Sequence, residues 1–353
     1  MIMGMVAAQM RAATGAAVTT VIGVALITTG GGGGTWVHVD INGNTIATPA
    51  ASWFNAHTIW GGLQDVTLDS QAMVAVPKFY VRRAVIASGA NAGKQAWWIA
   101  HQPTTGFRLH SAFRNAGADI NQFYVGKYQA SMQSTKLASV AGVMPAVSRS
   151  MTQFIADAAA RNVSGTTGFM LWSAFQWSAL QWLYLVEHAT MDSQNKTGAG
   201  RVNETAAANV DAADVAQATY RGVVGLWGNV RQLLDGLKTV SGVVNLWDQN
   251  GNKGWISTGR TRAAQTGIIY PTTFMDGAGA SWDLEDVFLG DTGPSANADA
   301  TLPDYQYQQT SGEVFTFAGG SYNNADVAGL WYILIGVTQS ATSTSTGARM
   351  AKV

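Results

Sequence analysis

The most restrictive feature of this sequence is a helical segment, residues 173–187, that is apolar on almost every side. Ser173-Ala-Phe-Gln176 has the spacing of a capping box, in which Ser and Gln side chains satisfy free amides at a helix start. The run SAFQWSALQWLYLVE carries large apolar side chains around its circumference. It is too short to span a membrane, and it contains Gln176 and Gln181. We therefore expect it to be the central buried helix of its domain.

The rest of the chain predicts one further helix and many short strands. Ser150-Met-Thr-Gln153 repeats the capping-box spacing and opens a helix through Arg161. Alternating or aromatic-rich stretches predict strands, and Asn-Gly pairs at positions 42–43 and 250–251 predict turns between them. These strand stretches lie at residues 36–41, 65–81, 97–99 and 122–128, and again after residue 203. Helices in the middle, followed by irregular strands, predict an α+β fold.

Three segments are predicted along the chain. Residues 1–34 form an N-terminal helical and β attachment arm, in which Met1–Ala13 is a helix between subunits and Val18–Thr28 a strand. The five glycines from Gly30 to Gly34 predict a flexible linker that ends the arm. Residues 35–90 form a small β-rich lead-in, and residues 91–353 form the main domain. The apolar stretch Ala16–Thr29 is too short for a membrane span and lacks a basic leader, so we expect neither an anchor nor a signal peptide.

Composition narrows the possible partners. Charged residues make up 12% of the chain and the formal net charge is zero, so the basic patch of a nucleic-acid-binding protein is not expected. Zero net charge does little to oppose self-association, which suits a protein held in an assembly. The chain has no cysteine, which excludes disulfides, thiolate metal sites and cysteine nucleophiles.

Four segments, taken in order over residues 70–353, resemble the C-type-lectin-like domains related to formylglycine-generating enzyme. Such domains also occur in phage tail proteins and in retroelement-diversified variable proteins. Pro77-Lys-Phe-Tyr80 with Phe123–Ser131 is similar to the early strands, and Phe169–Trp177 is similar to the start of the family's helix. Tyr220–Val230 resembles the "GLxDMxGNVWEW" segment. Ala318-Gly-Gly-Ser-Tyr-Asn323 followed by Gly347-Ala-Arg349 is similar to the closing "RGGSW…GFR" frame.

This resemblance, closest to the phage tail versions, implies a tail-tip or fibre protein of the virion that acts outside the cell. We expect it to bind a host surface receptor (a glycan, pilus or outer-membrane protein) without covalent chemistry. Residues 1–34 would contact other tail proteins and assemble a homotrimer. The alternative is a structural baseplate or fibre-cap protein without receptor contact, in which low charge serves packing between subunits.

The predicted receptor-binding surface lies in the segment between Gly320 and Gly347. In the retroelement-diversified relatives this region contacts ligand, and here aromatic side chains stand among small polar ones, a composition typical of recognition surfaces. A core strand followed by a solvated turn explains the same composition, and it is the interpretation we favour for Leu330, Leu334 and Ile335. The candidate receptor-binding residues are Tyr322, Asn323, Asn324, Trp331, Tyr332, Gln339 and Thr342.

We expect no catalytic site, metal or cofactor. The five histidines are scattered, no G-x-S-x-G elbow occurs, and the cysteine on which formylglycine-generating relatives depend is absent. Asp283, Glu285, Asp286 and Asp291 cluster as a glycosidase pair would, yet their polar, loop-like surroundings favour a solvated face. Asp248–Asn252 lacks the pattern of a calcium-binding loop, and a turn between strands fits it better. Trp227-Gly-Asn-Val230 is assigned to the core, with the Asn bridging backbone groups.

Overall fold

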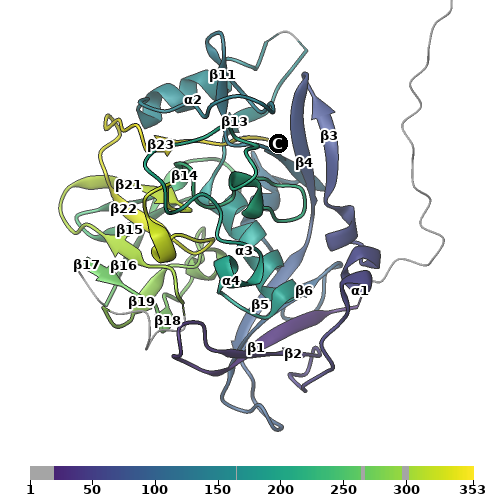
Figure 1. Cartoon of the computed structure of the whole chain (residues 1–353). Coiled ribbons are helices and arrows are strands. Elements are labelled where there is room, and N and C mark those ends of the chain that lie inside the picture. The colour runs from purple at the N-terminus through teal and green to yellow at the C-terminus, as the bar shows by residue number, and fades with distance from the viewer. Residues whose placement is uncertain (1–19, 164, 264–266, 296–301) are drawn as a thin grey trace, which may run out of the picture.

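Helix α3 (Ala174–His188) crosses the centre of the molecule, with strands on both sides of it (Figure 1). The computed structural model describes residues 20–163, 165–263, 267–295 and 302–353. Every α3 residue from Ala174 to Val186 is buried, as the sequence predicts. The predicted capping box is also present: Ser173 Oγ accepts from Gln176 N at 3.3 Å, and Gln176 Oε1 accepts from Ser173 N at 2.9 Å.

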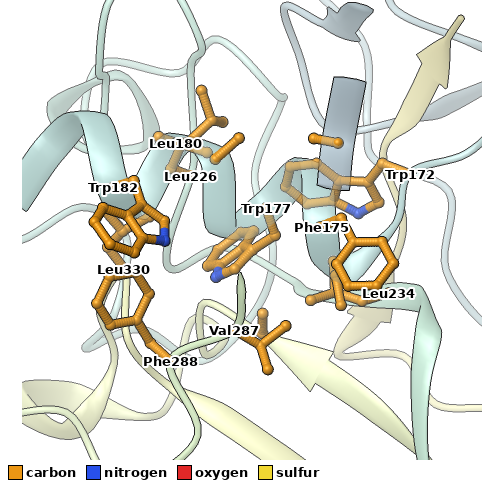
Figure 2. Packing of buried hydrophobic residues seen from close by; sticks show 14 of the residues in the cluster. Trp172, Phe175, Trp177, Leu180, Trp182, Leu226, Leu234, Val287, Phe288 and Leu330 are labelled. Atoms are coloured by element: carbon orange, nitrogen blue, oxygen red, sulfur yellow. The ribbon is translucent and has the colours of Figure 1, made fainter. Parts of the chain in front are cut away.

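Aromatic side chains of α3 make up much of the core around it. Trp177 packs edge-on against Trp172, with ring centroids 5.0 Å apart, and Trp182 lies 5.7 Å from Phe288. Figure 2 shows Trp182 beside Phe288 and Leu330 at the left of the view, with Trp172 at the right, near the start of the helix. The contacts of Trp182 join α3 to segments more than 100 residues later in the chain, so the helix organises the larger of the two hydrophobic clusters; the smaller one includes Ala25 and Trp98 of the first sheet.

Two five-stranded sheets lie on one side of α3 and an eight-stranded sheet on the other (Figure 1). The first sheet has the order β2 (Thr35–Val39), β1 (Ile22–Thr28), β6 (Gln95–Ala100), β5 (Tyr80–Val85), β7 (Arg108–Leu109). The second has the order β13 (Phe169–Leu171), β24 (Met350–Lys352), β10 (Gln122–Gly126), β4 (Gln71–Pro77), β3 (Gln64–Leu68). The third has the order β16 (Trp255–Thr261), β15 (Val243–Trp247), β14 (Arg231–Val240), β21 (Glu313–Ala318), β22 (Ile333–Val337), β20 (Gln306–Gln308), β17 (Gly267–Ile269), with β23 (Thr346–Gly347) parallel to β14.

Shorter elements complete a β-rich α+β architecture. Helix α2 (Met151–Ala159) begins at Ser150 with the predicted capping box. Within the described ranges, the other helices are α1 (Ala51–Ala56) and α4 (Ser193–Lys196), and 3-10 turns occur at η1 (Trp60–Gly62), η2 (Ser111–Phe113), η3 (Val215–Gln217), η4 (Leu284–Asp286) and η6 (Ala325–Val327). Small two-stranded sheets pair β11 (Ser131–Gln133) with β12 (Lys136–Ala138), β18 (Thr273–Phe274) with β19 (Gly290–Thr292), and β8 (Arg114–Asn115) with β9 (Ala118–Asp119).

The five-glycine run is the turn of a hairpin, which corrects its interpretation as a flexible linker. Gly34 N donates to Gly30 O at 2.9 Å, and Gly30, Gly31, Gly32 and Gly34 have positive φ, so the run turns tightly between β1 and β2. β1 also pairs with β6, so strands from all three predicted segments share one sheet. The predicted helix at residues 1–13 lies outside the described residues.

Arg349, in the motif Gly347-Ala-Arg349, is completely buried, and its guanidinium connects β10 and β14 to two loops. Its guanidinium makes five hydrogen bonds with lengths between 2.7 and 2.9 Å. The acceptors are Gln232 Oε1 and the carbonyl oxygens of Gly126, Lys127, Val224 and Gly225. Burial lowers the pKa of Arg349 to about 9, so the side chain stays charged at neutral pH.

Candidate binding site

Trp331 and Tyr332, two of the predicted receptor-binding residues, are completely buried. Trp331 packs edge-on against Tyr184, with ring centroids 5.5 Å apart, and its backbone N donates to Asp304 Oδ2 at 2.8 Å. The Tyr332 hydroxyl lies 3.2 Å from that of Tyr305. These two aromatics lead into the core strand β22. The prediction that they belong to a receptor-binding surface is therefore wrong, because neither side chain is exposed.

The loop that precedes them does reach the surface. Asn323 is exposed, and Tyr322 and Asn324 are half-buried. Asn324 Oδ1 accepts from Ser321 N at 2.8 Å and from Arg231 Nε at 3.3 Å. These bonds hold the loop against the start of β14. Asn323, although exposed, also takes part, because its Oδ1 accepts from Ser321 Oγ at 2.9 Å.

The other two candidates, Gln339 and Thr342, are exposed on the loop 338–345. This loop is held in place by backbone hydrogen bonds: Met151 N donates to Gln339 O at 3.2 Å, and Ser148 N donates to Ser343 O at 2.9 Å. The loop therefore lies across the start of α2 rather than projecting freely.

Gln339 lies at the edge of a groove that the sequence analysis did not identify. The groove has a volume of about 270 Å³ and lies between α2 and strands β14, β15, β16 and β21. We call it the tryptophan groove. Its lining residues are Met151, Ile155, Asp235, Lys238, Trp247, Lys253, Trp255, Glu313, Phe315 and Gln339.

Three aromatic rings form one wall of the tryptophan groove. Trp247 and Trp255 are direct partners in the β15–β16 pairing, with ring centroids 6.2 Å apart. Phe315, on β21, lies 6.2 Å from Trp255 at a steep angle. Trp247 and Phe315 are buried, whereas Trp255 is half-buried and so keeps part of its ring open to a ligand.

Charged groups of both signs surround these rings. Lys238 Nζ lies 4.1 Å from the Trp255 ring centroid and donates to Glu313 Oε1 at 2.6 Å. Burial raises the pKa of Asp235 to about 6, although hydrogen bonding from Gly236 N and the charges of Lys253 and Lys238 act to lower it. The groove thus offers an aromatic surface beside hydrogen-bonding groups, the combination found in sites that orient small polar ligands.

The sequence did contain a signal for this groove. Trp247 and Trp255 stand at the ends of two strands that flank the predicted Asn250-Gly251 turn, and the structure confirms that turn. Residues opposite each other in a hairpin share one face of the sheet, so the two indoles had to be neighbours. Lys238 and Phe315 come from other strands, and their position depends on the pairing of β14 with β21.

The acidic cluster is not the solvated face that the sequence suggested. Asp286 is fully buried; it accepts from Arg108 and Ser111 side chains and from Gln249 Nε2 at 2.8 Å. Asp283 pairs with Arg108 Nε at 2.7 Å. Burial acts to raise the pKa of Asp286, but the charge of Arg108 and these hydrogen bonds lower it overall. All of these contacts of the Asp286 carboxylate are structural. The sequence could not predict them, because the partners come from distant parts of the chain.

Most of the histidines are occupied by structural contacts. Burial lowers the pKa of His57, His110 and His188 to about 4, so these rings are neutral at physiological pH. His110 Nδ1 accepts from Ala112 N at 3.2 Å and its Nε2 lies 3.1 Å from Ser178 Oγ. Asn229 is also buried as predicted, and it donates to Gln129 Oε1 at 2.8 Å.

Among the described residues, no group of three or more His, Asp or Glu side chains is placed to hold a metal ion. No helix in the described ranges is long and apolar enough to cross a membrane. Comparison with protein families gives no match, and comparison with curated proteins gives none either.

Two solved structures are similar to this chain at low identity. PvdO from Pseudomonas aeruginosa is 11% identical, with 82% of this chain and 98% of that chain covered and a TM-score of 0.35. Treponema denticola variable protein 1 is also 11% identical, with the same coverage of both chains and a TM-score of 0.37.

Proposed function

We propose that this protein is a non-enzymatic recognition protein with a C-type-lectin-like fold, and that it binds a carbohydrate of a bacterial surface in the tryptophan groove. The setting we propose is the one that the sequence resemblance implies, a phage tail tip or fibre. The half-buried ring of Trp255, beside Lys238, Glu313 and Gln339, carries the proposal.

Carbohydrate suits this groove because a sugar ring has both apolar and polar edges. Its C–H face can pack on the indole of Trp255, whose ring face is negatively polarised. Its hydroxyls can bond to Glu313, Lys238 and the amide of Gln339, which come from three different segments. The volume of about 270 Å³ is just below the usual range of small-molecule sites, so the groove fits about one sugar unit. Weak binding to one unit would be multiplied by several copies of the protein in one particle.

A structural cap remains the competing function, and the two functions differ in what the groove contacts. In a cap, another protein subunit covers the Trp255 face and no free carbohydrate binds there. The predicted homotrimer and the contacts of residues 1–34 with other tail proteins belong to either proposal.

Binding to immobilised lipopolysaccharides and capsular polysaccharides from a panel of bacteria tests the proposal. Wild type should bind one of them saturably, and Trp255→Ala should lose that binding, because the only half-open ring of the groove is removed. Trp53→Ala is the matched control, since Trp53 is also half-buried but lies on α1, away from the groove. If Trp255→Ala binds as well as wild type, the site is wrong. If wild type binds none of the panel, the structural cap is the better explanation.

A further inference from the structure

Two turns of this chain share the pattern Asp-x-Asn-Gly-Asn, at residues 40–44 and 248–252. In an Asn-Gly pair the backbone nitrogen of the glycine can attack the side-chain amide of the asparagine, because glycine has no Cβ to obstruct the approach. Neither pair lines the tryptophan groove. The surroundings of the two pairs differ, so the turns compare one reaction at two places in the same molecule.

The attacking nitrogens of the two turns are held alike. Gly43 N donates to Asp40 O at 3.0 Å. Gly251 N likewise donates to Asp248 O at 3.0 Å, and the two glycines have similar φ angles of +87° and +79°. A Cβ added at Gly43 would lie 2.7 Å from Ile86 Cγ2, so the packing of the first turn requires glycine after the asparagine. The bond to the glycine nitrogen therefore does not distinguish the two turns.

The side chain of Asn42 is exposed and free to rotate. Its backbone N donates to Asp40 Oδ1 at 2.9 Å, but its side-chain amide has no hydrogen bond to the residues that the structure describes. Its carbonyl oxygen accepts none from those residues either. The peptide unit between Asn42 and Gly43 is thus held by one bond within the described ranges, the bond from Gly43 N to Asp40 O. Breaking this bond allows the nitrogen to approach Asn42 Cγ.

Asn250 is half-buried, and both ends of its side-chain amide are bonded. Its Nδ2 donates to Asp248 Oδ1 at 3.0 Å, and its Oδ1 accepts from Arg114 Nη1 at 3.3 Å. Its carbonyl oxygen also accepts from Gly117 N at 2.7 Å, so the peptide unit between Asn250 and Gly251 is bonded through its oxygen as well as its nitrogen. The β8–β9 hairpin, which supplies Arg114 and Gly117, therefore restrains this turn.

From this difference we propose that Asn42 is a site of spontaneous deamidation and that Asn250, in the same pattern, is protected. At Asn42 a bond forms between Gly43 N and Asn42 Cγ, and the Cγ–Nδ2 bond breaks. The side-chain nitrogen takes up the proton of the glycine nitrogen and leaves as ammonia. Water then opens the succinimide that results. Opening at the side-chain carbonyl gives aspartate, and opening at the backbone carbonyl gives isoaspartate, whose backbone is one carbon longer.

The modification changes both the charge and the contacts of the first turn. Either product adds a negative charge to a chain whose formal net charge is zero, so the modified protein should be a distinct acidic species. Isoaspartate also lengthens a turn that anchors two side chains: Asn91 Nδ2 donates to Gly43 O at 2.9 Å, and Trp98 Nε1 donates to Asp40 O at 2.7 Å. The proposal does not depend on carbohydrate binding, because the tryptophan groove has other residues.

Peptide mapping by mass spectrometry of the full chain, aged in mildly alkaline buffer, measures both asparagines in one sample. We expect conversion of Asn42 to be at least about tenfold faster than conversion of Asn250, because three further hydrogen bonds restrain Asn250. In the chain unfolded in urea the two rates should become similar, since the reacting pair is the same. Equal rates in the folded chain would overturn the proposal. So would an intact Asn42 after a time that converts the unfolded chain completely.

Two variants test the cause of the difference. Asn42→Gln should remove the acidic species from isoelectric focusing of the aged protein, because glutamine closes the corresponding ring far more slowly. Arg114→Ala should speed conversion of Asn250 several-fold and leave Asn42 unchanged, because it removes one of the bonds that restrain Asn250. Arg260→Ala, an exposed arginine on β16, is the matched control and should leave both rates unchanged. An acidic species that persists in Asn42→Gln, or an unchanged rate at Asn250 in Arg114→Ala, would refute this explanation.

Discussion

Replacing Arg349 by Met, which keeps an unbranched stem but lacks the guanidinium, should strongly destabilise this protein. The substitution removes five hydrogen bonds from a completely buried site. Two of the acceptors keep other donors: Gly225 O is also bonded by Gln129 Nε2 at 3.0 Å, and Lys127 O by Val224 N at 2.8 Å. The loss therefore falls mainly on the remaining acceptors.

Val224 O and Gln232 Oε1 would lose the one donor that the described residues provide for each. A buried acceptor left without a partner costs about 1–3 kcal/mol, so the two together cost about 4 kcal/mol. For 353 residues, an unfolding entropy of about 2.1 cal/mol/K per residue converts this loss to a melting temperature lower by about 5 °C. Loss of packing against the Trp172 ring, whose centroid is 5.3 Å from the guanidinium, adds to the effect.

Differential scanning calorimetry of wild type, Arg349→Met and the control Arg260→Met measures this difference. Arg260 is exposed, so its replacement should leave the melting temperature nearly unchanged. Arg349→Lys should fall between wild type and Arg349→Met, because an ammonium has three donors in place of five. A melting temperature of Arg349→Met within about 1 °C of the control would refute the hydrogen-bond argument.

Three further predictions follow from buried groups. Trp331→Ala should lower the free energy of unfolding by about 3–5 kcal/mol in a urea titration, as for other core tryptophans; a loss below about 1 kcal/mol would mean that the ring is not in the core. Burial raises the folded-state pKa of Asp235 to about 6 from 3.8, so wild type should lose about 3 kcal/mol relative to Asp235→Asn between about pH 4 and pH 7. In this pH range the folded form keeps a proton on Asp235 that the unfolded chain has released. Parallel curves of unfolding free energy against pH for the two proteins would contradict this. Ser173→Ala should cost about 1 kcal/mol because it removes the cap of α3, with Ser340→Ala on an exposed loop as its control.

Local patterns in the sequence predicted the elements that depend on neighbouring residues. The two capping boxes, at Ser150 and Ser173, are both present, because the bonds that define them join residues three positions apart. The all-round apolar surface of α3 predicted its central position, since only full enclosure removes such a surface from water. The turn at Asn250-Gly251 was predicted for the same local reason.

Features that depend on distant partners could not be predicted in this way. A glycine run permits both a flexible linker and a tight turn, and the pairing of β1 with β2 decided between them. Asp286 lies in a polar stretch of sequence, yet Arg108, 178 positions earlier, allows its burial. Trp331 and Tyr332 have the composition of a recognition surface, but the strand that follows them draws both rings inward.

The sequence by itself determined a cysteine-free α+β chain built around one apolar helix, because capping, turn chemistry and helical periodicity act over a few residues. Only the tertiary structure decided which aromatic and charged side chains meet. Trp255, Lys238 and Phe315 share the tryptophan groove because β15 pairs with β16 and with β14, and β14 pairs with β21. Arg83 likewise bonds to Met275 O, almost 200 positions later in the chain. The local hairpin therefore accounts for the Trp247–Trp255 pair, whereas long-range strand pairing and packing, which no local pattern records, add Lys238 and Phe315 to the groove.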